Sequence, residues 1–164
     1  HTRAGVIGVR ATTRTMESAN VARLCRDFGR GVEVLLQPCP GLVELVERGE
    51  LGSAATRSAL SALIAPLLAK GADTLVLGCT HYVFLAPLIR ELAGETVTII
   101  ESSDAVARHT LRHVDQAPLP AMTSSPPREI FLTTGSPEHA RTVFSQLWGA
   151  PVEVEALAGE PACH

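Results

Sequence analysis

Apolar residues gather in short runs that alternate with segments of helical spacing. Runs rich in valine, isoleucine and leucine predict buried strands at residues 4–9, 32–36, 74–77 and 96–100. Apolar positions three and four apart predict helices at residues 16–27, 41–47, 53–70, 84–93 and 103–113. Pro66 lies inside the longest helical segment, and we expect it to kink or split that helix. The alternation indicates an α/β fold, with a parallel sheet covered by helices on both faces.

The alternation of predicted strands and helices is interrupted at residues 117–127, where four of the eleven residues are proline. We interpret the stretch as a loop or a domain linker. A further strand is predicted at residues 130–133, and Ser136 and Pro137 have the residue types of a helix start. That helix is expected to end near Trp148, before a last strand at residues 152–157.

Composition narrows the possible partners. The chain has 164 residues, a net charge of −3, and aromatic residues make up only 4% of it. We therefore expect no nucleic-acid partner, because neither a basic footprint nor a stacking platform is present. The sequence contains no apolar run of membrane-spanning length and no signal peptide, so we expect no membrane partner. Because residue 1 is histidine, we expect a processed chain or a fragment.

The cysteine and histidine positions do not predict a metal site. The four cysteines form no CxxC pair, and we expect reduced thiols; they are Cys25, Cys39, Cys79 and Cys163. Three histidines fall in predicted helices, and we expect them to be surface or core residues without ligand partners; they are His109, His113 and His139. Neither a metal nor a cofactor is expected.

The segment from Leu77 to Tyr82 is the main candidate for chemistry. A strand ends at Gly78, and a thiol, a hydroxyl and an imidazole follow at Cys79, Thr80 and His81. Open α/β folds bind ligands at the carboxyl ends of their strands. A cysteine at a helix N-terminus is favoured as thiolate, and a neighbouring imidazole can move its proton. The alternative is that Cys79 is a small buried apolar residue, as many free cysteines are.

Hydroxyl side chains also follow other predicted strands. They are Thr12, Ser102, Ser103, Thr133 and Thr134. Together they could line a polar crevice around Cys79, whereas singly they are typical of helix caps and turns. By pattern alone, Glu47 is an exposed acid at the end of a short helix.

Residues 77–82 resemble the signature around the second catalytic cysteine of bacterial glutamate racemases. Other segments of the family are similar in order and spacing, at residues 5–12, 39–47, 99–102 and 131–135, so the resemblance runs from about residue 3 to residue 157. Three positions depart from the family pattern. Val83 stands where proline is usual, Val9 where threonine is common, and Glu101 where aspartate is usual.

The resemblance implies a cofactor-independent enzyme with two α/β domains and two cysteines on opposite faces of glutamate. Cys79 would serve the L-glutamate direction with help from His81, and Glu47 would tune that histidine. Thr80, His81 and Thr12 would contact the substrate.

The family's first catalytic cysteine lies before residue 1. The resemblance therefore implies that residues 1–112 form one domain and residues 113–164 complete the other, N-terminal one. The isolated chain would then be inactive. The full enzyme would be cytoplasmic, with a homodimer as one possible assembly, and would supply D-glutamate for peptidoglycan.

Two alternatives stay open on the sequence. One is an aspartate or hydantoin racemase of the same superfamily, since the pocket rather than the thiol sets substrate length. The other is a non-catalytic amino-acid-binding domain.

Overall fold

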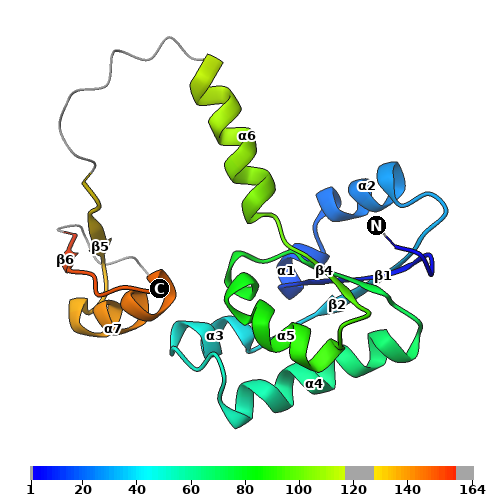
Figure 1. Ribbon diagram of the computed structural model, residues 1–164, viewed down its shortest axis with the longest axis horizontal. Helices are drawn as coiled ribbons and strands as arrows, with labels where there is room; N and C mark the ends of the chain where they lie inside the picture. Colours follow the sequence, from blue (N-terminus) through cyan, green and yellow to red (C-terminus); the bar gives the residue numbers. More distant parts are fainter. Residues whose placement is uncertain (1, 117–127, 158–164) are drawn as a thin grey trace.

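A four-stranded parallel sheet organises most of the chain (Figure 1). The computed structural model describes residues 2–116 and 128–157. The strands are β1 (Val6–Ala11), β2 (Glu33–Pro38), β3 (Thr74–Leu77) and β4 (Thr98–Ile100), in the order β2-β1-β3-β4. The α/β fold with a parallel sheet is therefore confirmed.

The register aligns the carboxyl ends of the three strands β2, β1 and β3. Arg10 of β1 lies opposite Gln37 of β2 and Leu77 of β3. Because all three strands are parallel, the residues that follow them emerge at one edge of the sheet. This edge is where the chain places Thr12 and Cys79.

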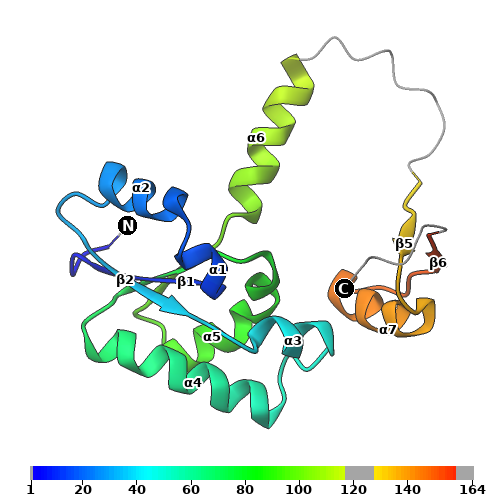
Figure 2. The same ribbon diagram turned by 180° about the vertical axis from the view of Figure 1, so that it is seen from behind.

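One face of the sheet carries the main hydrophobic core. Two helices cover it, α4 (Ala54–Ala69) and α5 (Ala86–Ala93), and both lie on the same side of the sheet in Figures 1 and 2. A short helix, α3 (Leu42–Glu47), and a 3₁₀ helix, η1 (Thr80–Leu85), extend this core toward the strand ends. Its most deeply buried apolar side chains are Leu42, Val46, Leu60, Ile64, Leu75, Leu85 and Ile89.

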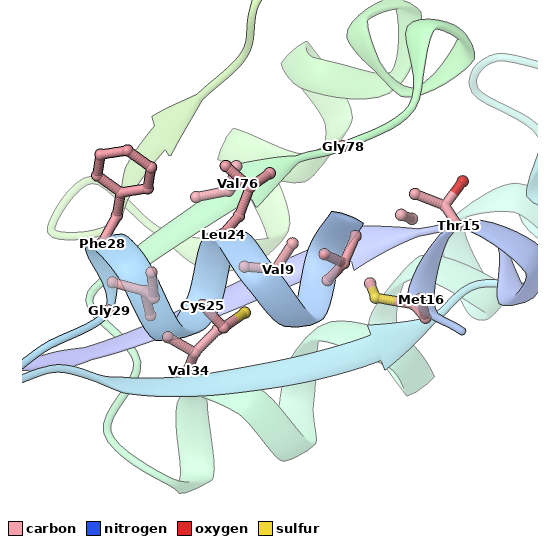
Figure 3. A pocket seen from close by; sticks show the side chains of 13 residues that line it. Val9, Thr15, Met16, Leu24, Cys25, Phe28, Gly29, Val34, Val76 and Gly78 are labelled. Carbon is pink, nitrogen blue, oxygen red and sulfur yellow. The ribbon is translucent and has the colours of Figure 1, made fainter. Parts of the chain in front are cut away.

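The opposite face is covered less completely. It carries α1 (Thr13–Met16) and α2 (Ala19–Phe28), and no residue of α2 is fully buried. An apolar cavity of about 410 Å³ lies between α2 and the sheet, with Val9, Val34 and Val76 on the sheet side (Figure 3). Phe28 of α2 stays 81% exposed at its margin. The sheet is thus covered on both faces, but only one face is closely packed.

The C-terminal part forms a second, smaller sheet. Its strands β5 (Phe131–Thr133) and β6 (Val154–Ala156) are parallel, and α7 (Pro137–Trp148) connects them. The side-chain amide of Gln146 donates to the carbonyl of Gly49 at 2.9 Å, and Leu147 packs against the main core. These contacts join α7 to the first part of the chain.

Helix α6 (Ser103–Gln116) extends away from the four-stranded sheet, and all its described side chains from Ser103 onward are exposed (Figure 1). The predicted linker at residues 117–127 lies outside the described residues. Within the described ranges, none of the helices combines the length and apolar character needed to cross a bilayer.

Several predicted boundaries are wrong. The first strand runs two residues further than expected, to Ala11, because hydrogen bonding to β2 and β3 continues through the polar Arg10. The helix predicted at residues 16–27 begins only at Ala19, since Ser18 caps α2 by accepting a hydrogen bond from the Val21 amide. The predicted threonine-rich turn before it forms the separate short helix α1. Pro66 does not split α4. It is exposed, and so is Ala62, whose carbonyl loses its helical partner there and faces water.

Asp73 anchors the start of β1 to the start of β3. Its carboxylate accepts the Thr2 hydroxyl at 2.6 Å and the amides of Arg3 and Ala4 at 2.7 Å each. The hydrogen bond from Thr2, followed by that from Ala4, holds the pKa of Asp73 well below its usual range. These hydrogen bonds therefore fix residues 2–4, which lead into β1, next to the start of β3.

Candidate active site

Cys79 lies directly beyond β3, at the edge where the strands end. Its backbone is extended, with φ −137° and ψ 135°, and its side chain is partly exposed. The α-helix predicted at residues 84–93 is present as α5, but between Cys79 and that helix lies the six-residue 3₁₀ helix η1. A helix this short has little dipole, so the expected stabilisation of a thiolate by a helix N-terminus is not supported.

A carboxylate, an imidazole and the thiol form a chain of contacts at this edge. The Cys79 sulfur lies 3.8 Å from Nδ1 of His81. Nε2 of the same ring lies 2.7 Å from a carboxylate oxygen of Glu47, the last residue of α3. The His81 side chain is 31% exposed and that of Glu47 58%, so the chain of contacts opens to solvent.

This order of groups can move a proton to and from sulfur. When Nε2–H donates to Glu47, Nδ1 of His81 carries a free lone pair and can accept the thiol proton. The carboxylate then orients the ring and stabilises the positive charge that the imidazole gains. The arrangement can therefore supply a thiolate next to open solvent.

The two threonines predicted to bind substrate have different surroundings. Thr80 is exposed at the start of η1, beside Cys79. Thr12 caps α1, where its hydroxyl oxygen accepts the Thr15 amide at 3.3 Å and lies 2.8 Å from the Thr15 hydroxyl. Contact with substrate stays a prediction for both residues.

The expected ring of hydroxyls at the strand ends is only partly present. Thr133 and Thr134 belong to the β5–β6 part, so the register of the main sheet does not bring them to the edge that carries Cys79. Ser103 begins α6, and its amide donates to the carboxylate of Glu101 at 2.8 Å.

A buried tyrosine holds the loop after β2 against η1. Tyr82 is 1% exposed, and its hydroxyl donates to the carbonyl of Cys39 at 3.0 Å. Burial raises the pKa of Tyr82, although the positive charge of Arg10 opposes the rise. The phenol therefore stays protonated and fixes Cys39 and α3 relative to Cys79.

Arg10 is not among the residues that the sequence pattern singles out. This residue is fully buried, and none of its three guanidinium nitrogens has a hydrogen-bond partner among the described residues. Its burial could have been predicted from the two-residue period of a strand, because Arg10 lies on the same, core-facing side of β1 as Gly8. A positive charge therefore lies inside the core, next to Tyr82.

The described residues contain no group of three or more histidine, cysteine or acidic side chains arranged to hold a metal ion.

Comparison with known proteins relates this fold and site to a family. The family model described as Asp/Glu/Hydantoin racemase matches residues 1–110. A glutamate racemase from Stutzerimonas stutzeri is 44% identical over 154 residues, which make up 94% of this chain and 58% of that protein.

Solved structures agree with this relationship. Glutamate racemase RacE1 from Bacillus anthracis matches with a TM-score of 0.79 and 29% identity over 95% of this chain and 58% of its own. Escherichia coli glutamate racemase, solved with L-glutamate and the activator UDP-MurNAc-Ala, matches with a TM-score of 0.81 and 26% identity, over 96% of this chain and 59% of its own. The chain thus spans somewhat more than half the length of these relatives, and by the family match it belongs to the Asp/Glu/Hydantoin racemase family.

Proposed function

We propose that this chain is part of a glutamate racemase and carries one of its two catalytic thiols. The observation that supports the proposal most directly is the contact of Cys79 with His81, and of His81 with Glu47, at the strand edge. The named relatives support glutamate as the substrate rather than aspartate or a hydantoin.

In the proposed reaction, the Cys79 thiolate removes the α-proton of L-glutamate. The sulfur–hydrogen bond forms as the carbon–hydrogen bond breaks, and the electron pair stays on the α-carbon. A second thiol then gives a proton to the opposite face of that carbon, so neither an oxidant nor a cofactor is consumed. In the reverse direction, Cys79 returns its proton to the carbanion formed from D-glutamate.

His81 and Glu47 have supporting roles in this proposal. His81 accepts the thiol proton at Nδ1 before each cycle and contacts the substrate. Glu47 keeps the ring in the tautomer that leaves Nδ1 free. Thr80 and Thr12 donate hydrogen bonds to the substrate, which stabilises the developing negative charge.

The second thiol belongs to the part of the relatives that this chain does not span. We propose that residues 1–112 form one domain and that residues 113–164 complete the other. The isolated chain then lacks one proton carrier and is inactive. The complete protein would be cytoplasmic, with a homodimer as one candidate assembly, and would supply D-glutamate for peptidoglycan.

The test measures exchange of the α-proton of L-glutamate in D₂O, together with formation of D-glutamate, by the complete protein. We expect Cys79→Ala to lower turnover at least about 10³-fold, since removal of a proton carrier costs more than loss of one supporting donor. Cys25→Ala is the matched control, because Cys25 lies in α2 and takes no part in the Cys79–His81–Glu47 contacts, so this variant should keep full turnover.

Three other results would favour a different substrate, a different role for Cys79, or a protein that only binds amino acids. Preferential turnover of aspartate or a hydantoin would replace the substrate but keep the thiol chemistry. Full activity of Cys79→Ala would reject the proposed role of Cys79. Glutamate binding without α-proton exchange in the complete protein would indicate an amino-acid-binding protein.

A further inference from the structure

Two histidines of α6 face each other, contrary to the expectation that they lack partners. His109 and His113 are one helical turn apart, and their Nε2 atoms lie 3.0 Å from each other. The rings stand edge to face, with centroids 4.4 Å apart and an angle of 79° between the planes. Both side chains are exposed on the outer part of α6.

We propose that this α6 histidine pair, His109 and His113, binds a divalent transition-metal ion, with water completing the coordination. Imidazole is a common ligand of Zn²⁺, Cu²⁺ and Ni²⁺, and it coordinates through the lone pair of an unprotonated ring nitrogen. The two Nε2 atoms lie 3.0 Å apart on exposed side chains, a separation from which small ring rotations can turn both lone pairs toward one ion.

The separation of the two nitrogens suits a shared metal ion. With metal–nitrogen bonds of about 2.05 Å, ligands at a right angle are about 2.9 Å apart and ligands at a tetrahedral angle about 3.3 Å apart. Both separations lie within a few tenths of an ångström of the observed 3.0 Å, so small side-chain rotations would accommodate either geometry. Ni²⁺, Cu²⁺ and Zn²⁺ are all imidazole-binding ions of suitable size.

Without metal, one Nε2–H donates to the other Nε2. Binding moves that hydrogen to Nδ1 of the same ring, so that both Nε2 lone pairs point to the ion. Arg108 and Arg112 also lie on α6 and oppose a cation. Both are exposed and screened by water, and Asp104 lies 3.6 Å from Arg108.

The bound ion links two successive turns of α6. A helix whose described side chains are all exposed gains little from packing, so a bond across one turn should slow the opening of its backbone. Metal binding would thus stiffen the segment that leads from β4 toward the C-terminal part.

The experiment titrates the complete protein with Ni²⁺ above the pH range in which imidazole is protonated, and follows the histidine ring protons by NMR. We expect the His109 and His113 signals to broaden together at the lowest Ni²⁺ concentrations. Amide exchange in α6 should slow in the same titration. Site-resolved signals are needed because other histidines compete for the ion.

Single variants test the chelate directly. His109→Ala and His113→Ala should each weaken Ni²⁺ binding at this site about tenfold or more, because one ligand loses the effective concentration of the other. His139→Ala, an exposed histidine of α7, should leave it unchanged. Alanine favours helices, so both test variants should keep α6 folded, which circular dichroism checks.

Two results would overturn the proposal. One is separate broadening of the two ring signals. The other is unchanged affinity in either α6 variant, which would leave the pair as an imidazole–imidazole hydrogen bond only. Neither result bears on Cys79, so failure here is distinguishable from failure of the proposed racemase activity.

Discussion

Arg10 is the residue whose surroundings differ most from what its chemistry requires. A buried charge is normally paired or hydrogen-bonded, because its removal from water costs several kcal/mol. The guanidinium of Arg10 is fully buried, and no partner for it lies among the described residues. Arg10 lies opposite Gln37 of β2 and Leu77 of β3, so its backbone is fixed inside the sheet although its side chain is charged. Arg10 should therefore weaken the fold that contains it.

Arg10→Met should stabilise the chain. Methionine keeps much of the side-chain volume and removes the buried charge, so the free energy of unfolding should rise by about 1–4 kcal/mol. Urea unfolding followed by circular dichroism measures this change. Arg23→Met, at an exposed position of α2, is the control and should change stability by less than about 0.5 kcal/mol. A less stable Arg10→Met variant would mean that the guanidinium has a stabilising partner.

At the scale of elements, periodicity predicts the order and type of the strands and helices well. The strand at residues 74–77 is confirmed residue for residue, because its apolar run coincides with its hydrogen-bonded length. The first strand was misplaced because backbone pairing, rather than apolar character, sets where a strand ends. The break before α2 depends on the Ser18 cap, a local hydrogen bond that an apolar pattern does not contain.

The candidate site was predictable in its residues but not in its contacts. Cys79 and His81 are two positions apart, and a strand end followed by these residue types is visible in the sequence. Glu47 is 34 positions from His81, and nothing in the pattern around it indicates the 2.7 Å contact. Only the resemblance to a family linked them, because the packing of α3 against η1 is a tertiary feature.

Gly8 lets the central strand approach α4 and β3 closely. A Cβ atom at this position would lie 2.8 Å from Leu67 Cδ1 and 2.9 Å from Leu75 Cδ2, and both leucines are buried. Gly8→Ala should lower the free energy of unfolding by about 1–3 kcal/mol through overpacking. A Cβ on Gly52 would meet no atom within 4 Å, so Gly52→Ala should leave stability unchanged or slightly higher. Equal stabilities of the two variants would show that the leucines move aside freely.

At the scale of the whole molecule, α7 joins the C-terminal part to the main sheet. Its contacts with the first part include the hydrogen bond from Gln146 to Gly49 and the packing of Leu147 on the core. An apolar groove beside this contact is lined by Phe84 of η1 and by residues of the C-terminal part, namely Phe131, Phe144, Leu147 and Trp148. The junction is small, so we expect it to open more easily than the main sheet.

Leu147→Ala should loosen this junction selectively. Its side chain is only partly buried, so the loss should be roughly 1 kcal/mol, below the 2–5 kcal/mol typical of fully buried leucine. Hydrogen exchange should become faster in α7, β5 and β6, with β1 and β3 unchanged. The control is His139→Ala, at an exposed position of the same helix. Faster exchange throughout the main sheet would show that the two parts unfold as one unit.

The placement of β1 between β2 and β3 has a consequence for synthesis on the ribosome. Of the four strands of this sheet, β1 is made first and lies in the interior, so β2 and β3 must add to opposite sides of it. Until residue 77 has emerged, a β1–β2 pair exposes the free backbone groups of Val6–Ala11 on one side. Such a row pairs readily with other chains, so a nascent polypeptide paused before β3 is complete should be prone to aggregate.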